Sequence, residues 1–259
     1  MSEGDPAALD GSRAPLMDHL IELRRRLLWS VAALAAGFAL CLYFAKPIFG
    51  FLVQPLLRAG QGKIIYTDIF EAFFVEVKVA FFAAIMLAFP VIATQLWRFV
   101  APGLYAKEQR AFLPFLLVTP ILFGGGAALA YYFAMPVALS FLLSFQGNVG
   151  GVEQEALPAV GNYLSFVTRF LFGFGVAFLL PVLLMLLERS GVVSRAQLVA
   201  GRRYAIVGAF AVSAVLTPPD VVSQLMLAIP LILLYEGSLV AIWFTERRRA
   251  RNPVEQAPG

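Results

Sequence analysis

Long uncharged stretches, separated by short charged ones, dominate the chain. A helix needs about 20 apolar residues to cross the roughly 30 Å hydrocarbon core of a bilayer. By this measure the sequence predicts six membrane spans, at about 24–46, 69–99, 111–141, 162–188, 204–216 and 221–244. The fifth is too short to cross unaided, since a helix rises only 1.5 Å per residue. We therefore expect an all-α polytopic integral membrane protein with short fifth and sixth spans.

Composition supports this class. Hydrophobic residues make up 60% of the chain and charged residues 14%, with a mean hydropathy of +0.81, whereas soluble domains are roughly 45–50% apolar and about 25% charged. A water-soluble enzyme or a nucleic-acid binder is excluded on this ground. The single cysteine, Cys41, and the single histidine, His19, provide neither a disulfide nor a zinc site. We expect no cofactor, no metal and no nucleic-acid partner.

The basic residues predict the orientation. Loops on the cytoplasmic side of a membrane protein carry an excess of Lys and Arg. Fifteen basic residues lie at one side of the predicted spans and three at the other, namely Lys46, Arg58 and Lys63. Both termini are therefore expected in the cytoplasm, with residues 1–13 and 247–259 as flexible tails of a single membrane domain.

No arrangement of residues predicts catalysis, but two acids stand out on the basic side. Glu22 precedes the first span and Glu108 lies between the second and third. Two carboxylates could pair bidentately with guanidinium groups of a ligand. A simpler interpretation is open for each: Glu22 is spaced for an intrahelical ion pair with Arg25 or Arg26, and Glu108 suits the start of a helix.

Ionisable residues inside spans suggest a different function. Glu71, Glu76 and Lys78 open the second span, and Glu236 lies in the sixth. Such residues usually face a bundle interior or an aqueous cavity. With Arg169 they leave open a proton-coupled small-solute transporter, although Lys78 could simply pair with Glu71 on one helix face. A scaffold for other membrane helices is a further alternative.

Three segments resemble one known family. They are residues 19–27 (HLIELRRRL), residues 99–105 (FVAPGLY) followed by Glu108 and Arg110, and residues 216–224 (LTPPDVVSQ). In this order, at these places among six spans, they are similar to the TatC family, the polytopic receptor subunits of the twin-arginine protein translocase. The resemblance covers nearly the whole chain.

The resemblance implies a non-enzymatic receptor in the bacterial inner membrane. It would bind signal peptides with consecutive arginines and move folded proteins with single-span TatA/TatB-type subunits, in a larger complex that holds several copies of this chain, using the protonmotive force. The matched signal-peptide positions are Glu22, Leu23, Arg24, Phe99, Glu108 and Arg110. Pro55, Thr217, Asp220 and Gln224 match positions linked to the outer face and to partner helices.

One position departs from the family pattern. The family commonly has Glu or Gln midway along the fourth span, whereas residues 174–181 (FGVAFLLP) place Leu179 there. A mechanism that needs a buried polar group at this position would lack that group in this chain.

Overall fold

The computed structural model describes residues 6–104 and 109–251. Nearly all of them are helical. The elements in chain order are α1 (Pro6–Tyr43), α2 (Ala45–Arg58), α3 (Glu71–Leu104), α4 (Gln109–Leu129), the π-helical turn η1 (Ala130–Ala134), α5 (Met135–Leu143), β1 (Gly147–Val149), β2 (Val152–Gln154), α6 (Val160–Ala177), α7 (Leu180–Arg189), α8 (Arg195–Ala200), α9 (Arg202–Leu216) and α10 (Val221–Arg251).

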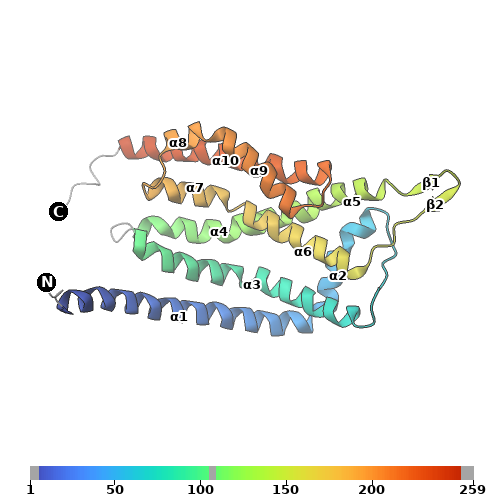
Figure 1. Cartoon of the computed structure of the whole chain (residues 1–259), viewed down its shortest axis with the longest axis horizontal. Coiled ribbons are helices and arrows are strands. Elements are labelled where there is room, and N and C mark those ends of the chain that lie inside the picture. Colours follow the sequence, from blue (N-terminus) through green and yellow to red (C-terminus); the bar gives the residue numbers. More distant parts are fainter. Residues whose placement is uncertain (1–5, 105–108, 252–259) are drawn as a thin grey trace, which may run out of the picture.

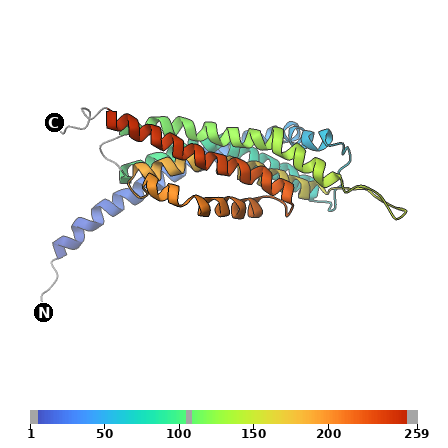
Figure 2. The ribbon, with the colours of Figure 1, turned by 90° about the horizontal axis from the view of Figure 1, so that it is seen from above.

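The long helices run side by side along one axis (Figure 1). The start of α1 and the end of α10 lie at the same end of this bundle, while α2 and the β1–β2 hairpin lie at the other. We call these the terminal end and the hairpin end. Figure 2 shows that the first part of α1 leans away from the other helices.

Five stretches of the described residues are long and apolar enough to cross a membrane: Leu20–Tyr43, Glu71–Phe99, Phe115–Leu143, Val160–Arg189 and Val221–Arg247. The predicted all-α membrane architecture is confirmed. The predicted fifth span corresponds to α9, whose 15 residues extend about 22 Å, less than the hydrocarbon core. The turn between α9 and α10 stops short of the level that α5 reaches (Figures 1 and 2). The count of six spans stays a prediction.

Two spans are interrupted. The third consists of α4, η1 and α5, and the fourth breaks between α6 and α7 at Phe178 and Leu179. Pro181 lies in the first turn of α7, where its missing N–H leaves no intrahelical bond unmade.

Glycines set the distance between α4 and α6. A Cβ added at Gly126 would lie 2.6 Å from the backbone oxygen of Phe174, and one added at Gly175 would lie 2.7 Å from the Phe123 ring. Of the three consecutive glycines in α4, Gly126 is buried and makes this close contact, while nothing lies within 4 Å of the positions that Cβ atoms would take at Gly124 and Gly125.

Several boundaries differ from the prediction. Helix α1 begins at Pro6, inside the stretch expected to be a tail, because proline is favoured in the first helical turn. The glycine-rich segment after the predicted third span forms a short hairpin in which Gly147 pairs with Gln154. Gly150 and Gly151 have φ of 63° and 91°, which suits a two-residue turn of type I′.

Candidate functional site

The terminal end holds a hollow between α1 and α3. Its centre is the ion pair of Glu22 and Arg26, one helical turn apart on α1. Glu22 Oε1 accepts hydrogen bonds from Arg26 Nε at 3.1 Å and from Arg26 Nη2. The simpler sequence interpretation of Glu22, an intrahelical pair, is therefore confirmed as a contact, with Arg26 as the partner.

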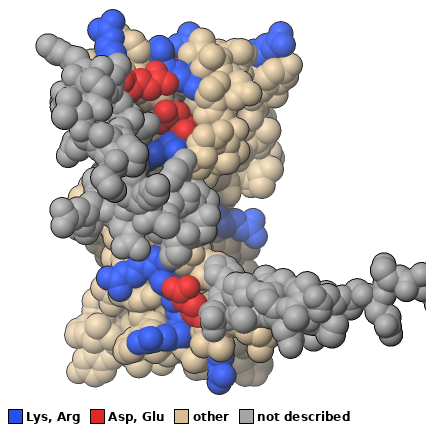
Figure 3. Space-filling model, turned by 90° about the vertical axis from the view of Figure 1, so that its left-hand side faces the viewer, with Lys and Arg blue, Asp and Glu red and all other residues tan. Residues whose placement is uncertain are grey.

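Arg26 also links the two helices. Its Nη1 donates to the backbone oxygen of Gln95 in α3 at 3.5 Å, and the Arg26 side chain is only 18% exposed. The hollow has a volume of about 450 Å³ and is lined by Glu22, Arg25, Arg26, Trp29, Gln95 and Arg98. Figure 3, which looks onto the terminal end, shows blue basic side chains around this face and few red acidic ones.

The charges in the hollow are unbalanced. One carboxylate, Glu22, lies among three guanidinium groups, those of Arg25, Arg26 and Arg98. Both bonds from Arg26 go to Oε1 of Glu22, and no described residue donates to Oε2. The Glu22 side chain is 37% exposed. Within the described part of the chain, one carboxylate oxygen therefore lacks a donor, while Arg26 fixes its orientation, and it can accept a hydrogen bond from a ligand.

Of the other predicted signal-peptide residues, none lines this hollow among those that the structure describes. Leu23 and Arg24 are exposed on α1 and Phe99 is half-buried near the end of α3. Arg110 lies in the first turn of α4. Glu108 lies outside the described residues. The structure therefore places Glu22, and the expectation that Glu22 and Glu108 lie close together stays a prediction.

The predicted outer-face residues fall in two places. Thr217, Asp220 and Gln224 meet at the turn between α9 and α10. The Thr217 hydroxyl donates to a backbone oxygen of α9 at 2.8 Å, and the Gln224 side-chain amide donates to another at 3.3 Å. Asp220 Oδ1 accepts from the Ser223 backbone N–H at 2.7 Å, which caps α10. Asp220 Oδ2 is enclosed and has no hydrogen-bond partner among the described residues.

Pro55 lies apart from these, buried in α2. A proline inside a helix cannot donate to the carbonyl four residues earlier, here that of Phe51. Tyr131 donates its hydroxyl to the Phe51 oxygen at 2.7 Å, and Tyr163 donates to the Leu52 oxygen at 2.8 Å. Sequence reasoning did not name these tyrosines, although the helical proline signals a carbonyl that needs a donor.

The acids inside the spans lie apart from one another in the structure. Glu236 pairs with Arg202 at 2.8 Å, both about half exposed. The interpretation that Lys78 pairs with Glu71 is wrong, since Glu71 instead accepts from Thr67, Asp68 and, through Oε1 at 2.6 Å, the Gly161 backbone N–H. Among the described residues no group of three His, Cys, Asp or Glu side chains could hold a metal ion.

Comparisons with known proteins agree with the fold and with the motifs. A sequence model described as TatC, Sec-independent protein translocase protein, matches residues 18–230. The chain is 52% identical over 242 residues to the Sec-independent protein translocase protein TatC of Magnetococcus marinus, covering 93% of this chain and 88% of that one. It is 41% identical over 241 residues to that of Escherichia coli, with 92% of both covered.

A solved structure has the same fold. The crystal structure of a twin-arginine translocase receptor, TatC, superposes with a TM-score of 0.74 at 40% sequence identity, covering 86% of this chain and 96% of that one. The family match spans well over half of the chain, covering the first four long apolar stretches and the start of the fifth. This chain belongs to the TatC family of Sec-independent protein translocase subunits.

Proposed function

We propose that this translocase subunit recognises the paired arginines of twin-arginine signal peptides with Glu22 and Glu108. The observation that carries the proposal is the state of Glu22: its carboxylate is oriented by Arg26, half exposed in a hollow, and has one oxygen with no described donor. An arginine of the signal would donate to that oxygen.

The charge balance in the hollow explains why a second acid is needed. Three guanidinium groups already surround Glu22, and they would repel two further arginines. Glu108 would supply the compensating charge four residues after Leu104, where α3 ends. Arginine would be preferred over lysine because its planar fork can donate two parallel hydrogen bonds to a carboxylate.

The test is binding of a fluorescent signal peptide to the purified full-length protein in detergent. The peptide is compared in an Arg-Arg and a Lys-Lys form, with the wild type, Glu22→Gln and Glu108→Gln. A hydrogen bond to a charged group contributes about 1.5–3 kcal/mol, so each variant should bind the Arg-Arg peptide about 10- to 150-fold more weakly. The Lys-Lys peptide should bind the wild type weakly.

Glu246→Gln is the matched control. Glu246 is a further acid near the terminal end, in a loose 3.8 Å pair with Arg195, and it does not line the hollow. Its removal should leave peptide binding unchanged. Wild-type affinity in both Glu22→Gln and Glu108→Gln, with unchanged thermal unfolding, would refute the assigned site.

The orientation and the partners are part of the same proposal. Both termini lie in the cytoplasm of a bacterial inner membrane, which the basic side chains at the terminal end support (Figure 3). Single-span TatA/TatB-type subunits contact the outer residues Pro55, Thr217, Asp220 and Gln224, and transport of folded cargo uses the protonmotive force. Loss of co-purified partner subunits in Asp220→Ala, with signal-peptide binding retained, is the expected result.

A further inference from the structure

A second cavity lies between α3 and α6, toward the hairpin end of the bundle. It has a volume of about 320 Å³, and its polar lining includes Lys78 and Arg169. Both cationic side chains are exposed, and neither makes a hydrogen bond or an ion pair with any described residue. An ionised group within a membrane span is unfavourable unless it is paired or reaches the interface.

The two cations lie at similar depth. The hydrogen bond from the Gly161 N–H to Glu71 Oε1 holds the first turns of α3 and α6 level. Lys78 is seven residues from Glu71 and Arg169 is nine from Val160, so they lie about 10 Å and 14 Å along their helices. Long basic side chains at such depths can extend toward the headgroups.

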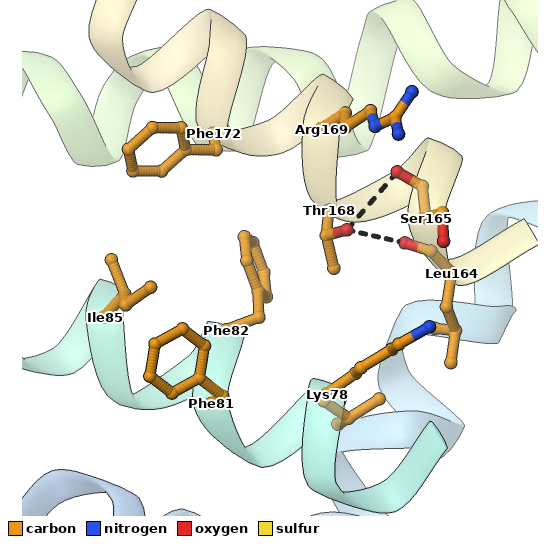
Figure 4. Close-up of a pocket in the computed structure, with 10 residues that line it drawn as sticks. Lys78, Phe81, Phe82, Ile85, Leu164, Ser165, Thr168, Arg169 and Phe172 are labelled. Atoms are coloured by element: carbon orange, nitrogen blue, oxygen red, sulfur yellow. Dashed lines mark hydrogen bonds between the residues drawn. The ribbon is translucent and has the colours of Figure 1, made fainter. Parts of the chain in front are cut away.

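The rest of the cavity is apolar and continues toward the middle of the bundle. Figure 4 shows Lys78 and Arg169 on one side and Phe81, Ile85 and Phe172 on the other. Phe81 and Phe172 are 49% and 41% exposed, so the cavity opens on a surface that faces lipid in a membrane. The Ser165 and Thr168 hydroxyls donate to carbonyls of their own helix. The basic groups are therefore the free donors on this wall.

We propose that this cavity binds an anionic phospholipid of the outer leaflet, with the phosphate between Lys78 and Arg169 and an acyl chain along Phe81, Ile85 and Phe172. The basic side chains lie at one side of the cavity and the apolar ones at the other, as the phosphate and the acyl chain do in such a lipid. Basic pockets between membrane helices bind anionic headgroups. Arg169 can hold a phosphate bidentately.

A partner helix is a poorer fit to the same cavity. A helix is about 10 Å wide with its side chains, so 320 Å³ would hold only about 4 Å of its length, less than one turn. A flexible acyl chain has no such requirement.

The test is native mass spectrometry of the full-length protein, titrated in neutral detergent with phosphatidylglycerol, phosphatidylcholine or inorganic phosphate. We expect the wild type to retain phosphatidylglycerol, and the double variant Lys78→Gln/Arg169→Gln to bind it at least tenfold more weakly. Arg58→Gln/Lys63→Gln is the matched control, because it removes two exposed cations near the same end that do not line the cavity. It should bind like the wild type.

Two further variants separate the parts of the site. Lys78→Arg/Arg169→Lys keeps both charges and should retain binding, whereas Ile85→Trp fills the apolar part and should weaken it with the charges intact. Should the double Gln variant unfold, Ile85→Trp decides. The proposal is overturned if phosphatidylglycerol binds wild type and variants equally, if phosphatidylcholine or inorganic phosphate binds as well as phosphatidylglycerol, or if the Gln variant loses only co-purified partner subunits.

Discussion

Replacing Gly126 with alanine is expected to force α4 away from α6. The new Cβ would lie 2.6 Å from the backbone oxygen of Phe174 and 2.8 Å from the ring of Phe178, and a backbone oxygen cannot turn aside as a flexible side chain can. Overpacking of this kind costs about 1–3 kcal/mol of folding free energy. Alanine also favours a helix over glycine by up to about 1 kcal/mol, which offsets part of the loss.

The neighbouring glycines allow the steric part to be measured by itself. Gly124→Ala and Gly125→Ala carry the same gain in helix propensity, and neither Cβ would meet an atom within 4 Å. Thermal unfolding of the purified proteins in one detergent should therefore place Gly126→Ala about 1–3 kcal/mol below both controls. At roughly 2–4 °C per kcal/mol this is a Tm lower by about 2–12 °C. Equal Tm values in all three variants would refute the close α4–α6 contact.

Three more substitutions test other contacts. Gly161→Ala places a Cβ 2.7 Å from Glu71 Oε1 and should cost about 1–3 kcal/mol of unfolding free energy, because the bond between the starts of α3 and α6 is lost. Tyr163→Phe removes the donor to the Leu52 oxygen, at 2.8 Å, and should cost about 1 kcal/mol. Glu236→Gln breaks an exposed ion pair and should change stability by less than about 1 kcal/mol, with signal-peptide binding unchanged. Thermal unfolding in detergent measures all three.

A specific result would contradict each of these three predictions. Wild-type stability of Gly161→Ala would show that the carboxylate of Glu71 is not fixed at this position. Wild-type stability of Tyr163→Phe would show that the Leu52 carbonyl does not depend on the tyrosine hydroxyl as its hydrogen-bond donor. Solute flux into sealed vesicles that is lost in Glu236→Gln would support the small-solute transporter.

The sequence predicts well what depends on neighbours along the chain. The long apolar stretches are confirmed because the bilayer imposes a length that a single helix must meet by itself. The Glu22–Arg26 pair was foreseeable for the same reason, since residues four apart lie on one face of a helix. The interrupted third and fourth spans were not foreseen, because the structure around a proline or a π-turn depends on what packs against it.

Contacts between helices that are distant in the chain could not be predicted from the sequence. Spacing within one span suggested that Lys78 pairs with Glu71, but the Glu71 carboxylate binds a backbone N–H ninety positions further along the chain. In the same way, nothing local to Tyr131 or Tyr163 shows that their hydroxyls reach carbonyls in α2. A single sequence shows which side chains can donate or accept hydrogen bonds, but it does not show which group each of them meets in the fold.

Leu179, the apolar residue at the break between α6 and α7, bears on the proposed lipid site. Leu179 is half-buried where the family commonly has Glu or Gln, and Arg169 is the sole charged residue between Val160 and Leu187. From Val160 to Leu187 the fourth span therefore contains a cation and no acid, and Glu71, at the nearby start of α3, already accepts four hydrogen bonds. Arg169 therefore needs an anion from outside this stretch or must extend to the membrane interface. An anionic lipid at the cavity it shares with Lys78 meets this requirement, and restoring the acid with Leu179→Glu should weaken phosphatidylglycerol binding less than removing Arg169 itself, since Leu179 does not line the cavity.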